Sequence, residues 1–130
     1  MKDIIEINGE QLTIVSNALL PRLYRFHFGR DLIVDMRKLA KSYIKTGENE
    51  DGSPIYEMAD DADTSALEQI SWLMLKAGGN DVGETIDEWL MSLEDVFDLW
   101  RIEGACMDLW KRSEKQTATL KKKAGRPSGK

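Results

Sequence analysis

Apolar and polar residues form two short mixed runs at the start of the chain. The runs IIEI and QLTIV contain β-branched residues and flank Asn8-Gly9-Glu10. Asn-Gly readily adopts the positive φ angles of a tight two-residue turn. The pattern therefore predicts a β-hairpin over residues 3–15. Because two strands alone are only marginally stable, this hairpin must pack against another part of the chain.

From Ser16 the spacing of apolar residues changes to three and four, which is typical of amphipathic helices. Ser16 or Asn17 can cap a first helix, and Pro21 is tolerated only within its first turn. Gly29 can adopt the left-handed backbone conformation that commonly ends a helix. The first helix is therefore expected to be short.

Asp31 can cap a second helix, whose apolar positions again recur at helical spacing: Leu32, Ile33, Met36, Leu39, Ala40, Tyr43 and Ile44. Residues 46–64 follow, with seven acids, two glycines and one proline around a small apolar island, Ile55-Tyr56. This composition predicts a solvated loop. Its acids lack the alternating spacing and closing glutamate of a calcium-binding loop.

The second half of the chain repeats the helical spacing. Ser65–Glu68 is a capping-box pattern that opens a helix ending at Gly78, and Thr85–Glu88 opens a shorter one ending before residue 94. The last long helix is expected to begin at residue 94 or 95 and to run past Trp110.

The expected fold is mainly α, with about five helices and the N-terminal hairpin (3–15) in one compact domain, residues 1–112. A disordered basic tail, residues 113–130, is expected to follow, because apolar periodicity is lost after Leu120. The predicted core contains Leu32, Met36, Leu39, Leu67, Ile70, Leu73 and Leu90.

Charge is distributed unevenly along the 130 residues. The chain has 18 Lys and Arg against 23 Asp and Glu, for a net charge of −5. Residues 111–130 hold eight basic side chains and one acid, or +7, which leaves −12 on residues 1–110. The acidic body makes nucleic acid an unlikely partner for the chain as a whole.

No set of residues predicts catalysis, a cofactor or a metal site. His27 and Cys106 are the only histidine and cysteine, and no third residue orients them as a base and a nucleophile. One cysteine also excludes an internal disulfide and suits a reducing compartment. Because no apolar run approaches 18 residues, we expect a soluble cytosolic protein with no membrane segment.

The stretch RLYRFHFGR combines arginines with aromatic residues, as a nucleic-acid contact surface would. In a helix, however, Leu23 and Phe26 fall on one side, which predicts that the aromatic residues pack. Arg22, Arg25, Arg30 and Asp31 are then interpreted as a structural junction between two helices, with the arginines paired to carboxylates or helix carbonyls.

Four tryptophans lie in the second half of the chain, and with six methionines they exceed what one small core requires. Surplus apolar surface usually serves a protein partner. The predicted partner-binding residues are Trp89, Trp100, Trp110 and Met107, because tryptophan dominates such contacts.

The order of these segments resembles the tail assembly chaperones of long-tailed bacteriophages, especially phages of Gram-positive hosts. The likeness covers roughly residues 4–112. It rests on INGE, LLPRLYRFHFGRDLIVDM, the acidic loop, ISWLMLKAGG, DEWLMSLEDVF and the lysine-rich end. Its most specific parts are RLYR with FGRD, and Trp72 with Trp89-Leu90.

The resemblance implies a non-enzymatic protein that coats the tape measure protein in the host cell cytoplasm and is absent from the mature virion. It also implies a longer product, made by ribosomal frameshifting, that recruits the tail tube protein. Consecutive lysine codons at Lys121–Lys123 could form the slippery site. Self-association into a homo-oligomer stays open.

Two other classes of function remain open from the residues alone. One is a small nucleic-acid-binding regulator that uses Arg22, Arg25, Arg30 and the basic tail. The other is a small enzyme that uses His27.

Overall fold

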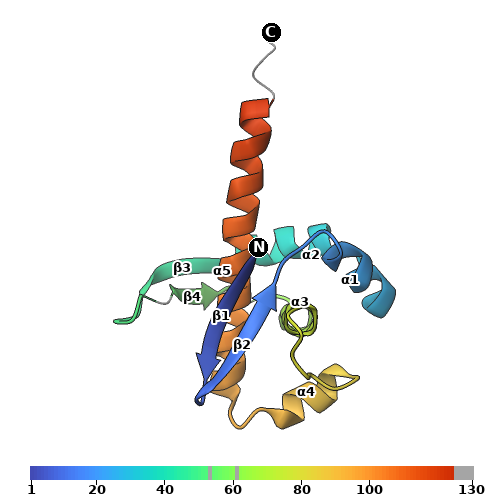
Figure 1. Cartoon of the computed structure of the whole chain (residues 1–130). Helices are drawn as coiled ribbons and strands as arrows, with labels where there is room; N and C mark the ends of the chain where they lie inside the picture. Colours follow the sequence, from blue (N-terminus) through green and yellow to red (C-terminus); the bar gives the residue numbers. More distant parts are fainter. Residues whose placement is uncertain (53, 61, 125–130) are drawn as a thin grey trace.

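The computed structural model describes residues 1–52, 54–60 and 62–124, with only the backbone at residues 56 and 116–124. In this part of the chain, five helices and two antiparallel hairpins surround one core (Figure 1). The elements in chain order are β1 (Lys2–Ile7), β2 (Glu10–Val15), α1 (Leu20–Phe28), α2 (Leu32–Ser42), β3 (Tyr43–Glu48), β4 (Pro54–Met58), α3 (Thr64–Ala77), α4 (Ile86–Ser92) and α5 (Val96–Ala124).

The predicted N-terminal hairpin is confirmed. Strands β1 and β2 pair from Lys2 opposite Val15 to Ile7 opposite Glu10. Asn8 and Gly9 form the turn with φ angles of 53° and 81°, so both residues adopt the positive φ that a two-residue hairpin turn requires. Ile7 and Ile14 are buried, which places one face of the hairpin on the core.

The helix caps agree with the sequence at two positions and differ at two. The Asp31 carboxylate accepts bonds from two backbone amides of α2, and the Thr85 hydroxyl accepts one from the backbone of α4, as predicted. Helix α3 is capped by Asp63, whose Oδ1 accepts from the backbone of residue 66, so the predicted Ser65 capping box is wrong. Helix α1 begins at Leu20, and Asn17 instead orders the turn before it.

The second hairpin was not predicted, and it corrects the expected loop at residues 46–64. Helix α2 ends at Ser42, because Tyr43 is already extended, with φ −120° and ψ 98°. Strands β3 and β4 then pair antiparallel, with an irregularity between Lys45 and Gly47. Ile44 and Ile55 are β-branched residues that favour strands. The sequence predicted a loop because the turn between these two strands is rich in acidic residues.

Helix α3 lies at the centre of the domain. It packs against β2, α1, α2, α4 and α5, and Figure 1 shows these elements around it. Of the predicted core residues, six are buried and Leu90 is only partly buried. The buried residues of α3 are Ala66, Leu67, Ile70, Ser71, Trp72, Leu73, Met74 and Leu75.

Gly78 allows the end of α3 to approach β2 closely. A Cβ atom at this position would lie 1.9 Å from the backbone oxygen of Thr13. The Asn80 side chain completes the contact, since its Nδ2 donates to the same Thr13 oxygen at 2.6 Å and to the Leu75 oxygen at 2.8 Å. The hairpin is therefore joined to α3 by backbone contact as well as by apolar packing.

Helix α5 is longer than expected and projects beyond the other elements (Figure 1). Its backbone is helical through Ala124, so residues 113–124 are helical where the sequence predicted a disordered tail. Residues 125–130 of that predicted tail lie outside the described residues. The domain boundary at residue 112 stays a prediction.

We expect Leu39→Ala to lower the free energy of unfolding by about 2–5 kcal/mol, because the side chain is fully buried and leaves a cavity. Val34 is exposed on the same helix, and Val34→Ala is the matched control, expected to change stability by about 0.5 kcal/mol or less. Urea denaturation measures both. Equal effects of the two substitutions would contradict the burial of Leu39.

Candidate functional site

Arg30 is the centre of a polar network at the corner between α1 and α2. Its Nε and Nη2 donate to the two carboxylate oxygens of Asp35 at 2.7 and 3.0 Å. Nη2 also lies 3.3 Å from Asp63 Oδ2. The buried Tyr24 hydroxyl donates to Asp35 Oδ2 at 2.6 Å and lies 3.1 Å from the Gln69 side-chain oxygen. The network thus joins α1, α2 and α3.

These contacts shift the pKa values of Asp35 and Tyr24. The hydrogen bonds from Arg30 lower the pKa of Asp35 more than its burial raises it. Burial, followed by the hydrogen bond to Asp35, raises the pKa of Tyr24. Asp35 is therefore ionised and Tyr24 protonated at neutral pH. Sequence reasoning missed Asp35 as the partner, because five residues of separation across a helix corner follow no local rule.

The other predicted junction residues have smaller roles. Arg25 forms an exposed ion pair with Asp31, in which Nη2 of Arg25 lies 3.6 Å from Oδ2 of Asp31. Arg22 is exposed, and within the described residues it makes no ion pair. Phe26 corrects the expectation that the aromatic residues pack, because its side chain is 80% exposed. Helix α1 instead turns Leu20 and Tyr24 toward the core.

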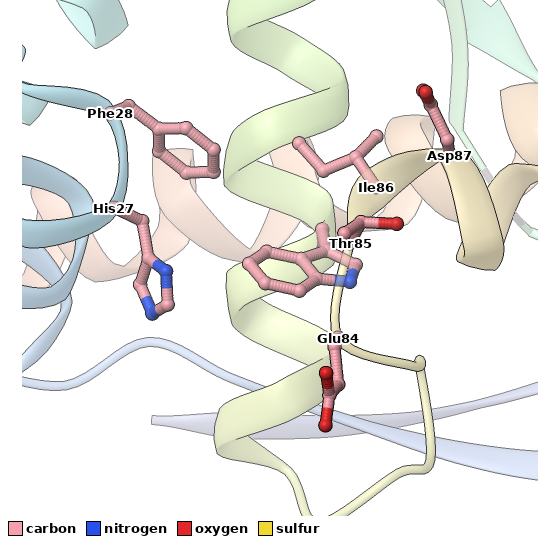
Figure 2. Close-up of a pocket in the computed structure, with 7 residues that line it drawn as sticks. His27, Phe28, Glu84, Thr85, Ile86 and Asp87 are labelled. Atoms are coloured by element: carbon pink, nitrogen blue, oxygen red, sulfur yellow. The ribbon is translucent and has the colours of Figure 1, made fainter.

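A shallow pocket of about 300 Å³ lies between the end of α1 and the start of α4, with Trp72 beneath it. Figure 2 shows His27 and Phe28 on one side of the pocket and Thr85 and Ile86 on the other. The ring centroids of His27 and Trp72 are 5.3 Å apart at an edge-on angle of 89°. Glu84 and Asp87 complete the lining.

The pocket residues are engaged in packing and helix capping. The Trp72 indole N–H donates to the Val82 oxygen at 3.1 Å, and the Thr85 hydroxyl accepts from the Glu88 backbone. Partial burial, with the charge of Lys76, lowers the pKa of His27, so its ring is neutral near pH 7. None of these contacts activates a nucleophile.

His27 and Cys106, which the sequence did not predict to form a catalytic pair, lie on different helices, α1 and α5. Cys106 is buried inside α5, and burial raises the pKa of its thiol to about 12, so the reactive thiolate is disfavoured. His27 is exposed on α1. Across residues 1–52, 54–60 and 62–124, no cluster of His, Cys, Asp and Glu is arranged to hold a metal ion.

Two of the four predicted partner-binding residues belong to the core. Trp89 and Met107 are buried and face other elements of the fold, so the folded domain does not present them to a partner. Trp110 is partly buried, and its indole N–H donates to Glu114 at 3.0 Å. Trp100 is the tryptophan with a largely free side chain, at 53% exposure.

Four exposed apolar residues lie close together in the chain where α4 ends and α5 begins. Phe97 is 62% exposed and contacts Trp100 edge-on, with ring centroids 5.3 Å apart. Met91 and Val96 are 87% and 49% exposed within the same ten residues. We call these four residues the α4–α5 apolar surface. Large exposed apolar groups that gather in this way mark contact sites for other proteins.

Sequence reasoning missed Met91, Val96 and Phe97 as surface residues, although a signal was present. The buried positions Ile102, Cys106 and Leu109 recur at helical spacing along α5. Phe97 and Trp100 lie off that stripe. The sequence could have identified them as exposed, because their positions fall on a different face of the helix from the buried apolar residues.

Glu103 is another buried carboxyl, located on α5 where that helix meets α3. Burial, together with the nearby Glu68 carboxylate, raises the pKa of Glu103 to about 8. Its side chain is thus protonated at neutral pH. Glu103 also raises the pKa values of Tyr43 and Cys106, after the larger effect of their own burial.

Comparisons with protein-family models, curated proteins and solved structures find no match to this chain. Among the described helices, none combines the length and apolar character needed to cross a membrane.

We expect Arg30→Ala to lower the free energy of unfolding by about 1–3 kcal/mol, because the buried Asp35 carboxylate loses its charged donor. Arg22→Ala is the control and should change stability by about 0.5 kcal/mol or less. Urea denaturation at pH 7 measures both. If Arg30→Ala had no effect, the corner would not depend on this ion pair.

Glu103 should make stability fall as pH rises. Its pKa is raised from 4.5 to about 8 in the folded state, so the folded chain holds a proton that the unfolded chain loses between these values. Glu103→Gln should raise the free energy of unfolding at pH 8 by about 1–3 kcal/mol and leave it nearly unchanged at pH 4.5. A constant difference at both pH values would contradict a protonated Glu103.

Proposed function

We propose that this chain is a tail assembly chaperone of a long-tailed bacteriophage. In this role it binds a helical segment of the tape measure protein and keeps it soluble in the host cytoplasm before the tail tube forms. The observation that carries the proposal is the α4–α5 apolar surface, which leaves two large aromatic rings and two aliphatic side chains in solvent. A protein that shields apolar helices needs such a surface.

The shape of the surface supports a helical client. Phe97 and Trp100 are three residues apart on one face of α5, and their rings are in contact. Adjacent aromatic side chains on a helix can pack against the apolar stripe of a second helix, as in helix-in-groove recognition. Trp100 stays an expected anchor, whereas Trp89 and Met107 are buried and are no longer expected to bind the client.

The charge of the body supports the solubilising role. Residues 1–110 carry a net charge of −12. Like-charged complexes repel one another, so a client coated with these chains would resist aggregation. The proposed role requires binding and no chemical step, in keeping with the buried Cys106 and the packed His27 pocket.

We also propose a longer frameshifted product that carries an extension near Lys121–Lys123 and recruits the tail tube protein. Helix α5 supports this arrangement, because it projects away from α4 and the rest of the body (Figure 1). An extension that leaves from its end would not obstruct the α4–α5 apolar surface.

A nucleic-acid-binding regulator is less well supported. Arg30 is bound to Asp35 and Asp63, and Arg25 is paired with Asp31. Of the three arginines in that proposal, only Arg22 extends into solvent without a carboxylate partner in the described part of the chain. The other positive charge in that proposal belongs to the basic tail, which begins within the C-terminal part of α5.

Co-expression with the tape measure protein of the same phage should raise the soluble yield of that protein. Trp100→Glu should remove most of the effect, because it places a charge in the centre of the apolar contact. Phe26→Glu is the matched control, since Phe26 is also an exposed aromatic residue and lies on a different helix. Gel densitometry of soluble and insoluble fractions measures the outcome.

The tail should contribute little to the same assay. Replacing Lys121, Lys122 and Lys123 with glutamine should leave the soluble yield unchanged. If these changes removed the effect while Trp100→Glu did not, the contact would be electrostatic and the α4–α5 apolar surface would not be the site.

A further inference from the structure

The segment of the chain that carries the α4–α5 apolar surface is negatively charged. Between Lys76 and Arg101 the sequence has seven acids and no lysine or arginine. Six of the seven are exposed, and the exception is Asp98, which accepts a hydrogen bond from the Asn8 side chain at 3.0 Å. Glu94 and Asp95 lie between Met91 and Val96 in the chain, so carboxylates interrupt the apolar residues.

The two basic residues that flank this segment in the sequence are held by other contacts. Arg101 follows Trp100, but its Nη2 donates to the Glu6 backbone oxygen at 3.2 Å, which holds it against β1. Lys76 lies with its Nζ 4.8 Å from the Trp72 ring centroid, at the end of α3. The ion pairs of the described residues all lie outside the segment between these two cations.

We propose that the partner of this surface is an amphipathic helix whose apolar face is bordered by lysine or arginine residues. The apolar face covers Phe97 and Trp100, and the basic side chains pair with Glu94 and the neighbouring acids. This inference rests on the proposed function, because it specifies the kind of client segment that the same surface binds. The charge complementarity selects among apolar helices and speeds their encounter.

A helix of this kind also fits the geometry better than an apolar or an acidic one. A purely apolar helix would bury carboxylates without partners, which is costly. An acidic helix would meet the exposed carboxylates of Glu94 and Asp95, which have the same sign. Lysine and arginine can place their aliphatic stems on the apolar rim and their charged ends near the carboxylates.

Two synthetic peptides of about 20 residues, or about 30 Å of helix, test the inference with the full-length chain. Both have the same leucine face, one bordered by lysine and the other by glutamate at the same positions. Fluorescence anisotropy of the labelled peptides measures binding. The lysine peptide should bind at least about tenfold more tightly at about 50 mM salt, and the difference should shrink at about 500 mM.

Matched variants separate this surface from the overall charge of the chain. Glu94→Lys should weaken binding of the lysine peptide by at least about threefold relative to Glu50→Lys. Glu50 is exposed in the turn between β3 and β4, so both variants change the net charge equally. Equal effects would mean that only the overall charge attracts the peptide, and would overturn the inference.

The remaining outcomes distinguish this inference from the proposed function. If both peptides bind equally and Trp100→Glu abolishes both, the surface binds apolar helices without charge selection; the inference then fails and the proposed function stands. If neither peptide binds, the proposed function fails at this surface. If the chain is a dimer that Trp100→Glu dissociates, a second copy covers the surface and the inference is wrong.

Discussion

Burial of α3 on nearly every side is the constraint on which the rest of the fold depends. Eight of its 14 residues are buried, and they face in all directions around the helix. A helix without a polar face is not stable in water by itself, so the other helices and the first hairpin must cover it. The β1–β2 hairpin, marginal alone, gains its stability from this contact and from the backbone approach at Gly78.

Two of the carboxyl groups that this packing buries, those of Asp35 and Glu103, are accommodated in opposite ways. Asp35 has a charged donor and a hydroxyl donor, so it remains ionised and joins three helices. Glu103 faces another carboxylate, so it retains a proton at neutral pH. A buried carboxyl is stable when it is either paired or neutral. Of these two arrangements, only the pairing of Asp35 fixes the relative positions of the helices that it joins.

The same packing decides which large apolar residues remain for a partner. Trp72, Trp89 and Met107 are used by the core, whereas Phe97 and Trp100 face outward because α5 turns a different stripe toward α3. The two ends of α5 thus differ in character. Its first turns combine aromatic rings with carboxylates, and its later part is basic and extends away from the body (Figure 1). A client bound at the start of α5 would therefore not interfere with an extension attached at its end.

Local signals in the sequence determined the elements whose causes are local. Asn8-Gly9 specified the first turn, Asp31 and Thr85 specified helix starts, and the spacing of apolar residues identified most of the core. Only the tertiary structure decided that Asp35 pairs with Arg30, that residues 43–58 form a hairpin, and that Trp89 is buried while Trp100 is exposed. The reason is physical: a cap or a turn depends on a few neighbouring residues, whereas burial and pairing depend on which faces of distant elements meet.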